Sequence, residues 1–111
     1  MRDNWMTQLR KGVLELVVLE VLHERKRYGY DLVQRICEVT GLEVGEGTVY
    51  PMLNRLKRAG LISSELMESA EGPARKYYRL TRIGRRELSW MRGEWASLVD
   101  RLAVLGETSD D

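Results

Sequence analysis

Apolar residues recur at helical spacing along the first part of the chain, in three stretches separated by glycine-containing breaks. The first stretch, from Trp5 to Glu24, predicts a helix because leucine, glutamate and valine recur without glycine or proline after Gly12. Residues 13–22 leave almost no polar face, so this helix needs cover on several sides. A turn in "RKRYGY" follows, and helical spacing resumes from Tyr30 to Val39.

The third stretch, "GEGTVYPMLNRLKRAGLI" from Gly45 to Ile62, spaces its apolar residues by three, four and seven positions, at Val49, Met52, Leu53 and Leu56. We expect this helix to begin with Thr48 as its N-cap, with Gly47 as the next candidate, and to end near a left-handed Gly60. Pro51 then lies in the first turn, where its missing N–H costs no hydrogen bond. A proline in a helix interior would cost about 3 kcal/mol.

The opposite face of this helix is polar and basic, with Tyr50, Asn54, Arg55, Lys57 and Arg58. Side chains of these types contact phosphates and base edges. For this segment taken alone, a solvated amphipathic helix without a specific role remains the alternative.

The periodicity changes after Gly60. Residues 61–69 alternate as a strand does, "AEGPA" predicts a turn, and residues 75–81 form a second strand with tyrosine and basic residues. The stretch from Gly72 to Arg86 holds six basic residues and no acidic one. Positive charge concentrated on a hairpin suits contact with phosphates, although each basic side chain alone could equally be solvated.

The last segment, from Arg82 to Gly106, predicts a long helix with apolar residues spaced by three and four, at Leu88, Met91, Trp95, Leu98, Leu102 and Leu105. This heptad seam could pack on the body of its own chain. We favour a second copy of the chain as its partner, because the first helix also has more apolar surface than so small a domain can cover.

Composition narrows the functional classes. The chain has 111 residues, 43% hydrophobic and 32% charged, which is typical of one soluble globular domain, and its net charge of +1 means that any attraction to nucleic acid is local. One cysteine, Cys37, and one histidine, His23, exclude an intramolecular disulfide and leave no metal-ligand set, so we expect no cofactor. Residues 13–22 are too short to span a bilayer and no signal peptide precedes them, which favours the cytoplasm.

The predicted order is helix, helix, helix, hairpin and long helix, a mainly α chain with a small β-hairpin. This is the order of the winged helix-turn-helix, in which the third helix enters the major groove of double-stranded DNA and the hairpin, or wing, lies along the backbone. The expected DNA-binding residues are Thr48, Tyr50, Pro51, Asn54, Arg55 and Arg58 on the helix, and Arg75 and Lys76 in the wing. We divide the chain into the winged helix-turn-helix, 1–81, a C-terminal dimerisation helix, 82–106, and a frayed tail, 107–111.

Four tracts, "LRKGVLELVVLEVL", "YGYDLVQRI", "GTVYPMLNRLKRAGLI" and "GPARKYYRLTRIGRREL", resemble the PadR family of bacterial transcriptional regulators. The resemblance covers Leu9 to Leu88 and thins beyond Trp90, and the single C-terminal helix looks like the short branch of the family. It implies a winged-helix repressor that dimerises through its C-terminal helix and releases DNA when a small aromatic or drug-like compound binds. On the matching positions it implies recognition-helix contacts from Tyr50, Asn54 and Arg55, and wing contacts from Arg75 and Lys76.

Two questions stay open at this point. An enzyme is not expected, because the chain lacks a glycine-rich phosphate loop, a metal-ligand cluster and a nucleophile with a base, but a winged helix used only for protein contacts is still an alternative. The second question concerns Trp95, a large ring at a seam position. In a symmetric dimer it would form, with Trp5, Leu9 and Met91, an aromatic-walled cleft for a small planar aromatic effector, unless it serves for packing alone.

Overall fold

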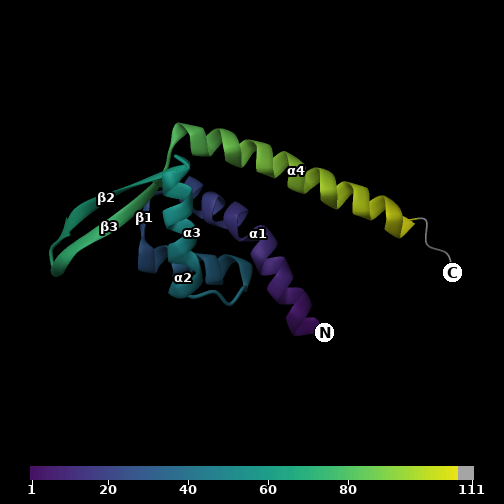
Figure 1. Ribbon diagram of the computed structural model, residues 1–111, viewed down its shortest axis with the longest axis horizontal. Helices are drawn as coiled ribbons and strands as arrows, with labels where there is room; N and C mark the ends of the chain where they lie inside the picture. The colour runs from purple at the N-terminus through teal and green to yellow at the C-terminus, as the bar shows by residue number, and fades with distance from the viewer. Residues whose placement is uncertain (108–111) are drawn as a thin grey trace.

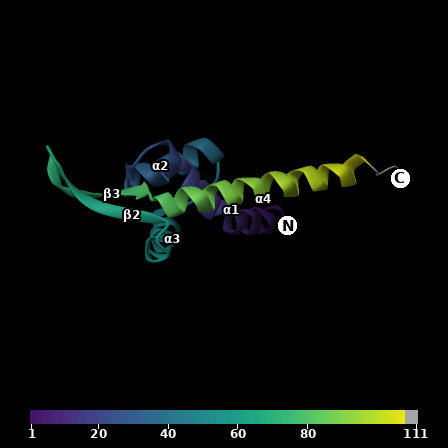
Figure 2. The same ribbon diagram turned by 90° about the horizontal axis from the view of Figure 1, so that it is seen from above.

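The computed structural model describes residues 1–107. Its elements are α1 (Arg2–Glu24), β1 (Arg27–Tyr28), α2 (Gly29–Thr40), α3 (Glu46–Arg58), β2 (Ile62–Ser69), β3 (Gly72–Leu80) and α4 (Arg82–Glu107). The first three helices and the base of the sheet form a body, from which the β2–β3 hairpin and α4 extend in opposite directions (Figures 1 and 2). The mainly helical architecture with a small antiparallel sheet confirms the predicted fold class.

The core of the body surrounds α1, as its apolar sequence requires. Val18 and Leu19 are fully buried, and α2, α4 and β3 all contact this helix. From α3, Val49, Leu53 and Leu56 enter the same core with no exposed surface, whereas Met52 is only partly buried. The core face of α3 is therefore narrower than its spacing suggests.

The sheet has three strands in the order β1-β3-β2, one more than the sequence indicated. The additional strand, β1, pairs Arg27 with Tyr78 and Tyr28 with Tyr77 of β3. The prediction of a turn in "RKRYGY" misses this strand, because two residues are too few to show alternation.

The predicted five-residue turn of the hairpin, "AEGPA", is wrong. The strand β3 begins at Gly72, so only residues 70 and 71 form the turn. Gly72 has a φ of 149°, which a residue with a side chain rarely adopts, and it pairs with Ser69 beyond an irregularity in the register. Pro73 is tolerated because β1 pairs with β3 only near Tyr77 and Tyr78, which leaves Pro73 without a neighbour on that edge.

The start of α3 also differs from the expectation. Gly45 is the N-cap, not Thr48 or Gly47, and its carbonyl accepts the N–H groups of Thr48 and Val49, each at 3.1 Å. Pro51 consequently lies in the second turn, inside the helix, where an ordinary residue would donate its N–H to the Gly47 carbonyl. The prediction that Pro51 costs no hydrogen bond is wrong, because α3 lacks that one.

The end of α3 confirms the expectation for Gly60. Its φ is 82°, and the next N–H, that of Leu61, donates to the Leu56 carbonyl at 3.0 Å. The chain then reverses into β2. Thr81, at the start of α4, donates its hydroxyl to the Gly60 carbonyl at 2.7 Å and so joins the two helix ends.

The first turns of α4 are packed on the body and the rest projects away from it. A Cβ on Gly84 would lie 2.0 Å from the Leu61 carbonyl oxygen, and Leu88 is buried in the core. The guanidinium of Arg92 donates to the Glu20 carboxylate of α1 at 2.8 Å, and beyond this pair α1 and α4 diverge (Figure 1). Glu107 ends the helix, and the remainder of the expected frayed tail, residues 108–111, lies outside the described residues.

Candidate nucleic-acid interface

The surface of α3 opposite the core is a row of four residues spaced by four, three and four positions, Gly47, Pro51, Asn54 and Arg58. All four are exposed. Thr48 and Arg55 flank the row on one side, whereas Tyr50 and Lys57 flank it on the other. The N-terminal half of this row leaves the helix backbone accessible, because glycine and proline project little beyond it.

Arg55 is held by another helix. Its Nη1 donates to the Glu15 carboxylate of α1 at 2.8 Å, and about half of the Arg55 side chain is exposed. Sequence reasoning missed this ion pair, because the two residues are 40 positions apart and each lies at the edge of an otherwise apolar pattern. Asn54 and Arg58 have no such partner among residues 1–107.

The wing contributes its two predicted residues from β3, and both are exposed. The Arg75 guanidinium lies over the Tyr28 ring, 4.6 Å from its centroid, and Tyr28 makes an edge contact with Tyr77. Stacking of this kind restricts the arginine without neutralising its charge. Lys76, one residue later, points to the other side of the strand.

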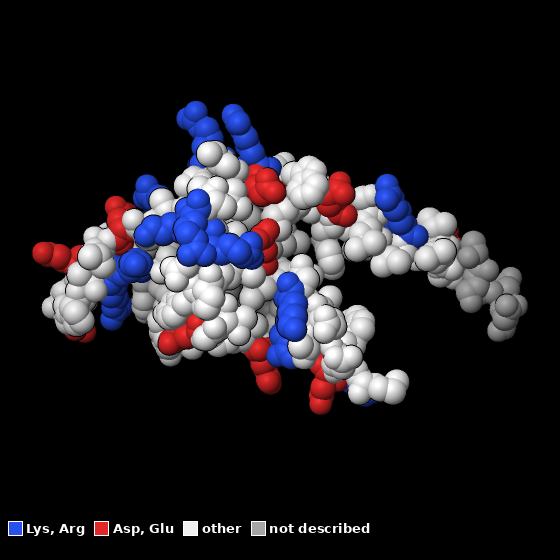
Figure 3. All heavy atoms as spheres, in the orientation of Figure 1, with Lys and Arg blue, Asp and Glu red and all other residues white. Residues whose placement is uncertain are grey.

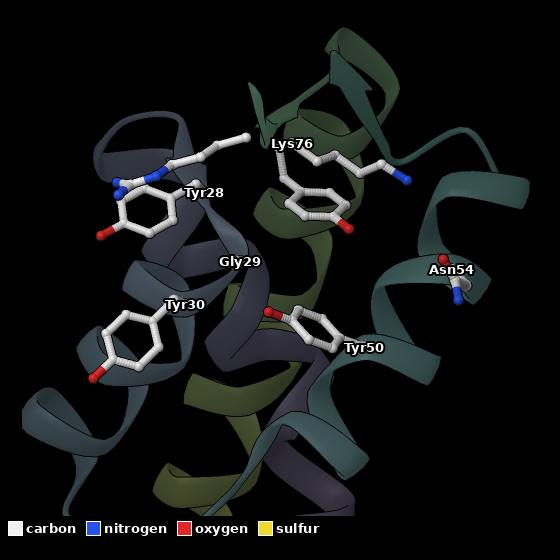
Figure 4. Close-up of a pocket in the computed structure, with 8 residues that line it drawn as sticks. Tyr28, Gly29, Tyr30, Tyr50, Asn54 and Lys76 are labelled. Carbon is white, nitrogen blue, oxygen red and sulfur yellow. The ribbon is translucent and has the colours of Figure 1, made fainter. Parts of the chain in front are cut away.

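A hollow of about 720 Å³ separates α3 from the wing and joins the two sets of residues. It is lined by Asn54 and Tyr50 of α3, by Arg75, Lys76 and Tyr78 of β3, and by Tyr28, Gly29 and Tyr30 at the start of α2 (Figure 4). The structure thus brings Tyr50, Asn54, Arg75 and Lys76 to one concave surface. The three residues around Gly29 were missed as site residues, although the tract "YGY" is a signal.

Tyr50 lies beside the exposed row, not on it. Its ring points toward Gly29 (Figure 4), and a Cβ on that glycine would come within 2.6 Å of the Tyr50 hydroxyl. Burial, and to a smaller extent the Glu46 carboxylate, raises the pKa of Tyr50 above its ordinary value. Tyr50 therefore remains a neutral hydroxyl at the wall of the hollow, able to donate or accept one hydrogen bond.

Charge is distributed unevenly over this face of the molecule. Basic side chains gather over α3, and acidic ones occur at the far end of the wing (Figure 3). The acidic residues of the wing, Glu65, Glu68 and Glu71, belong to β2 and the turn, whereas its basic residues belong to β3. Of the six basic residues that the sequence predicts between Gly72 and Arg86, three lie in β3, at the base of the wing, and three lie at the start of α4.

The four residues expected around an effector also lie together. Trp5 and Leu9 of α1 and Met91 and Trp95 of α4 line one hollow of about 510 Å³ between the diverging helices. Of the expected dimer-interface residues, Leu88 is buried within its own chain and Met91 is partly buried. The others, Trp95, Leu98, Leu102 and Leu105, are 44 to 66% exposed.

The one cysteine and the one histidine of the chain both lie within contact distance of other residues of the body. The Cys37 thiol lies 3.3 Å from the Val44 carbonyl oxygen, and His23 lies in the last turn of α1, with Nδ1 3.4 Å from an Arg92 nitrogen. Within residues 1–107, no group of His, Cys, Asp and Glu is arranged to hold a metal ion. No helix of this described part is long and apolar enough to cross a membrane.

Comparisons with known proteins agree on one family. Residues 18–90 match the model of the transcriptional regulator PadR-like family. The chain is 33% identical over 99 residues to an uncharacterized protein of Lysinibacillus sphaericus, covering 87% of this chain and 91% of that one. It is also 33% identical over 84 residues to the transcriptional regulator Rv3488 of Mycobacterium tuberculosis, covering 76% and 77% of the two chains.

Solved structures extend the likeness to the whole architecture. A PadR family transcriptional regulator from Eggerthella lenta superposes with a TM-score of 0.85 at 36% identity, over 96% of this chain and 93% of that one. A PadR-like transcriptional regulator from Bacillus cereus superposes with a TM-score of 0.83 at 32% identity, over 92% and 99%. With the winged architecture and the basic surface of α3, these matches show that the chain belongs to the PadR-like family of transcriptional regulators, which act by binding DNA and are not enzymes.

Proposed function

We propose that this chain is a homodimeric, sequence-specific DNA-binding repressor that responds to a small ligand. The DNA-binding part of this proposal is supported by the exposed row on α3, which lies beside the basic strand β3. Gly47 and Pro51 let the helix backbone approach the floor of a major groove. Asn54 and Arg58 supply an amide suited to adenine and a guanidinium suited to guanine.

The wing fits the phosphate backbone beside that groove. Arg75 and Lys76 are exposed at the rim of the hollow next to α3, where a phosphate passing the groove edge would lie. The carboxylates of Glu68 and Glu71 at the end of the wing repel phosphates, which favours a footprint limited to the base of the wing.

The dimer part of the proposal rests on the outer half of α4. Trp95, Leu98 and Leu102 are 44, 50 and 55% exposed along one side of this helix. Apolar residues in a continuous stripe at helical spacing are covered best by the same stripe of a second copy. Two-fold symmetry then calls for a pseudo-palindromic operator with half-sites about one helical turn, or a multiple of it, apart.

Selection of bound duplexes from a random DNA library tests the proposal directly. We expect the selected sequences to share a site with dyad symmetry, and the footprint of the protein on this site to be symmetric. Asn54→Ala should weaken binding to the selected site by about 1 to 3 kcal/mol and relax its sequence preference. Lys76→Ala should weaken all duplexes alike and reduce the dependence of affinity on salt concentration.

The alternative is a winged helix that contacts proteins and not DNA. It would be favoured if the library yielded no enriched duplex, and if binding to any duplex were unchanged in Asn54→Ala, Arg75→Ala and Lys76→Ala. An affinity for duplex DNA that stays the same at low and moderate salt would also favour the protein-binding alternative, because contacts to several phosphates make DNA binding steeply salt dependent.

The ligand part of the proposal rests on the hollow between α1 and α4. Its lining by Trp5, Trp95, Leu9 and Met91 suits the stacking of a small planar aromatic molecule. Such a ligand changes DNA affinity only if it prefers one spacing of the two recognition helices in the dimer. In a variant with Trp5 and Trp90 replaced by Phe, saturable quenching of Trp95 fluorescence by planar aromatic compounds would support the site. No saturable response across such a panel would assign Trp95 to packing alone.

A further inference from the structure

A second hollow, of about 400 Å³, lies where the C-terminal end of α1, the end of β3 and the first turns of α4 meet. Its lining includes four basic side chains, Arg25, Lys26, Arg79 and Arg85, together with His23 and the single carboxylate of Glu24. No other hollow described above has so many cations around one space. None of these residues belongs to the candidate DNA surface.

Three of the four cations lack a counter-charge. The guanidinium groups of Arg25, Arg79 and Arg85 form no ion pair and no hydrogen bond with any residue between 1 and 107. Lys26 is only loosely engaged, with Nζ 4.0 Å from a Glu65 oxygen and 3.6 Å from the Met67 sulfur. Most arginines of the body that approach another helix do have partners, as Arg27, Arg35 and Arg92 show.

Glu24, the one carboxylate of the lining, is already paired with arginines outside the hollow. Glu24 accepts hydrogen bonds from Arg35 at 2.9 and 3.0 Å and from Arg27 at 2.7 Å. The hydrogen bonds from Arg35 and then from Arg27 lower the pKa of Glu24 to about 2, so it stays ionised. Both oxygens of Glu24 accept hydrogen bonds from these arginines, and Glu24 forms no ion pair with Arg25, Arg79 or Arg85.

The start of α4 adds to the positive potential. The first turn of this helix has no acidic residue, and Arg82, Arg85 and Arg86 follow one another there. The N-terminal end of a helix carries partial positive charge, so arginines at this end are unfavourable unless an anion lies nearby. An anion would therefore stabilise both the N-terminal end of α4 and the unpaired guanidinium groups.

We propose that this hollow binds a small anion of the linear diphosphate or triphosphate class, either free or as part of a nucleotide. Guanidinium groups match phosphate oxygens in fork geometry, and the volume suits a small ligand. Its lining has no Phe, Tyr or Trp ring on which a base could stack, and its cations outnumber its one imidazole, so the phosphate chain is the part that is mainly recognised.

The DNA backbone is a less suitable occupant. The junction at Thr81 is bonded to Gly60 and Leu61, beyond the C-terminal end of α3. The row that faces the groove begins at Gly47, at the other end of a 13-residue helix about 20 Å long. The hollow is therefore distant from the N-terminal end of the row. Only Arg58, the last residue of the row, is close to the junction in sequence, and none of the cations of the hollow belongs to the row.

Calorimetric titration of inorganic triphosphate, and separately of ATP, into the full chain without DNA tests this proposal. We expect saturable binding with one ligand per chain, weakened at least tenfold in the double variant Arg79→Gln with Arg85→Gln. Tighter binding of ATP would identify a nucleotide as the ligand, and equal binding would identify the free phosphate chain. The control removes two exposed arginines that line neither the hollow nor the candidate DNA surface, Arg2 and Arg101, by the same substitution.

Absence of saturable binding up to millimolar triphosphate would overturn the proposal. An equal loss of binding in the control would do so as well, because it would reveal attraction to net charge alone. If instead the Arg79 and Arg85 variant lost affinity for duplex DNA as strongly as Arg75→Ala, the hollow would belong to the DNA path and not to a small ligand. Matching circular dichroism spectra and melting curves verify that each variant is folded.

Discussion

The apolar faces of α3 and α4 have the same spacing of three and four residues but very different surroundings. On α3, Val49, Leu53 and Leu56 are completely buried by the other helices and the sheet of the same chain. On α4, Leu88 is buried, whereas Leu98 and Leu102 remain about half exposed. Spacing thus predicts that a face will be covered, but only the position of the helix in the fold decides which molecule covers it.

The largest expected effect tests whether the uncovered face of α4 is an interface. Replacing both Leu98 and Leu102 by Glu would bury unpaired charge in a dimer, so we expect complete dissociation to monomers at micromolar concentration in analytical ultracentrifugation. Ala96→Glu with Ala103→Glu places the same charges, seven residues apart, on a flank of α4 that is turned away from Leu98 and Leu102, and should leave the dimer intact. A wild-type monomer under these conditions would contradict the dimer itself.

The second effect separates folding from association. Leu53→Ala opens a cavity in the core of the body and should lower the free energy of unfolding by about 2 to 5 kcal/mol. Leu102→Ala removes the same atoms from an exposed position, so its cost should appear in the dimer dissociation constant and hardly at all in the unfolding of the dilute monomer. Denaturant unfolding at two protein concentrations measures both. Equal losses at high dilution would mean that Leu102 packs within its own chain.

A third, smaller effect concerns the polar side of α3. Glu15→Gln should release Arg55 from its ion pair and remove a negative charge beside the DNA surface, so we expect DNA to bind up to about fivefold more tightly, worth about 1 kcal/mol. A double-mutant cycle with Arg55→Ala measures the coupling in a DNA titration. If Glu15→Gln leaves affinity unchanged in both backgrounds, Arg55 does not contact DNA.

The smallest expected effect concerns the ion pair between Arg92 of α4 and Glu20 of α1. The hydrogen bond from Arg92 lowers the pKa of Glu20 below its ordinary value of 4.5, more than burial raises it. A lowered pKa in the folded state adds stability above the ordinary pKa, and this stability is lost as pH falls through the lowered value.

At pH 7, Glu20→Gln should therefore cost less than about 1 kcal/mol, because the side chains of Arg92 and Glu20 are 45% and 40% exposed. The variant and the wild type should converge in thermal stability as the pH falls through the lowered pKa of Glu20. Glu94→Gln removes an exposed carboxylate with no ion pair among residues 1–107 and should change little. A constant difference at all pH values would assign the effect of Glu20 to packing.

The helices and the hairpin could be predicted from the sequence because each has a long periodic pattern. The left-handed Gly60 was also predictable, since glycine there is a local requirement. The N-cap of α3 could not be predicted. Thr48 has a stronger capping preference than Gly45, but the packing of Val49, Leu53 and Leu56 places Thr48 inside the first turn of the helix.

Contacts between distant residues were beyond sequence reasoning. The candidate residues Asn54, Arg75 and Lys76 were found because they sit on predicted elements, but the pairing of Arg55 with Glu15 depends on how α1 crosses α3. In the same way, the separation of Arg25, Arg79 and Arg85 along the chain hides the hollow they share. Local pattern predicts which residues are exposed, and only the packed structure shows which of them meet.

The tight joint at the start of α4 makes this helix a lever. Gly84 lies against the Leu61 carbonyl with no room for a side chain, and Thr81 is bonded to the two residues that follow the end of α3, so α3 and α4 turn together. With 26 residues, α4 is about 39 Å long, so a rotation of this joined unit by about 5° moves the far end of α4 by about 3 Å relative to the joint. In the proposed dimer, small angular changes where two copies meet would thus displace the two α3 helices by distances comparable to the spacing of successive base pairs.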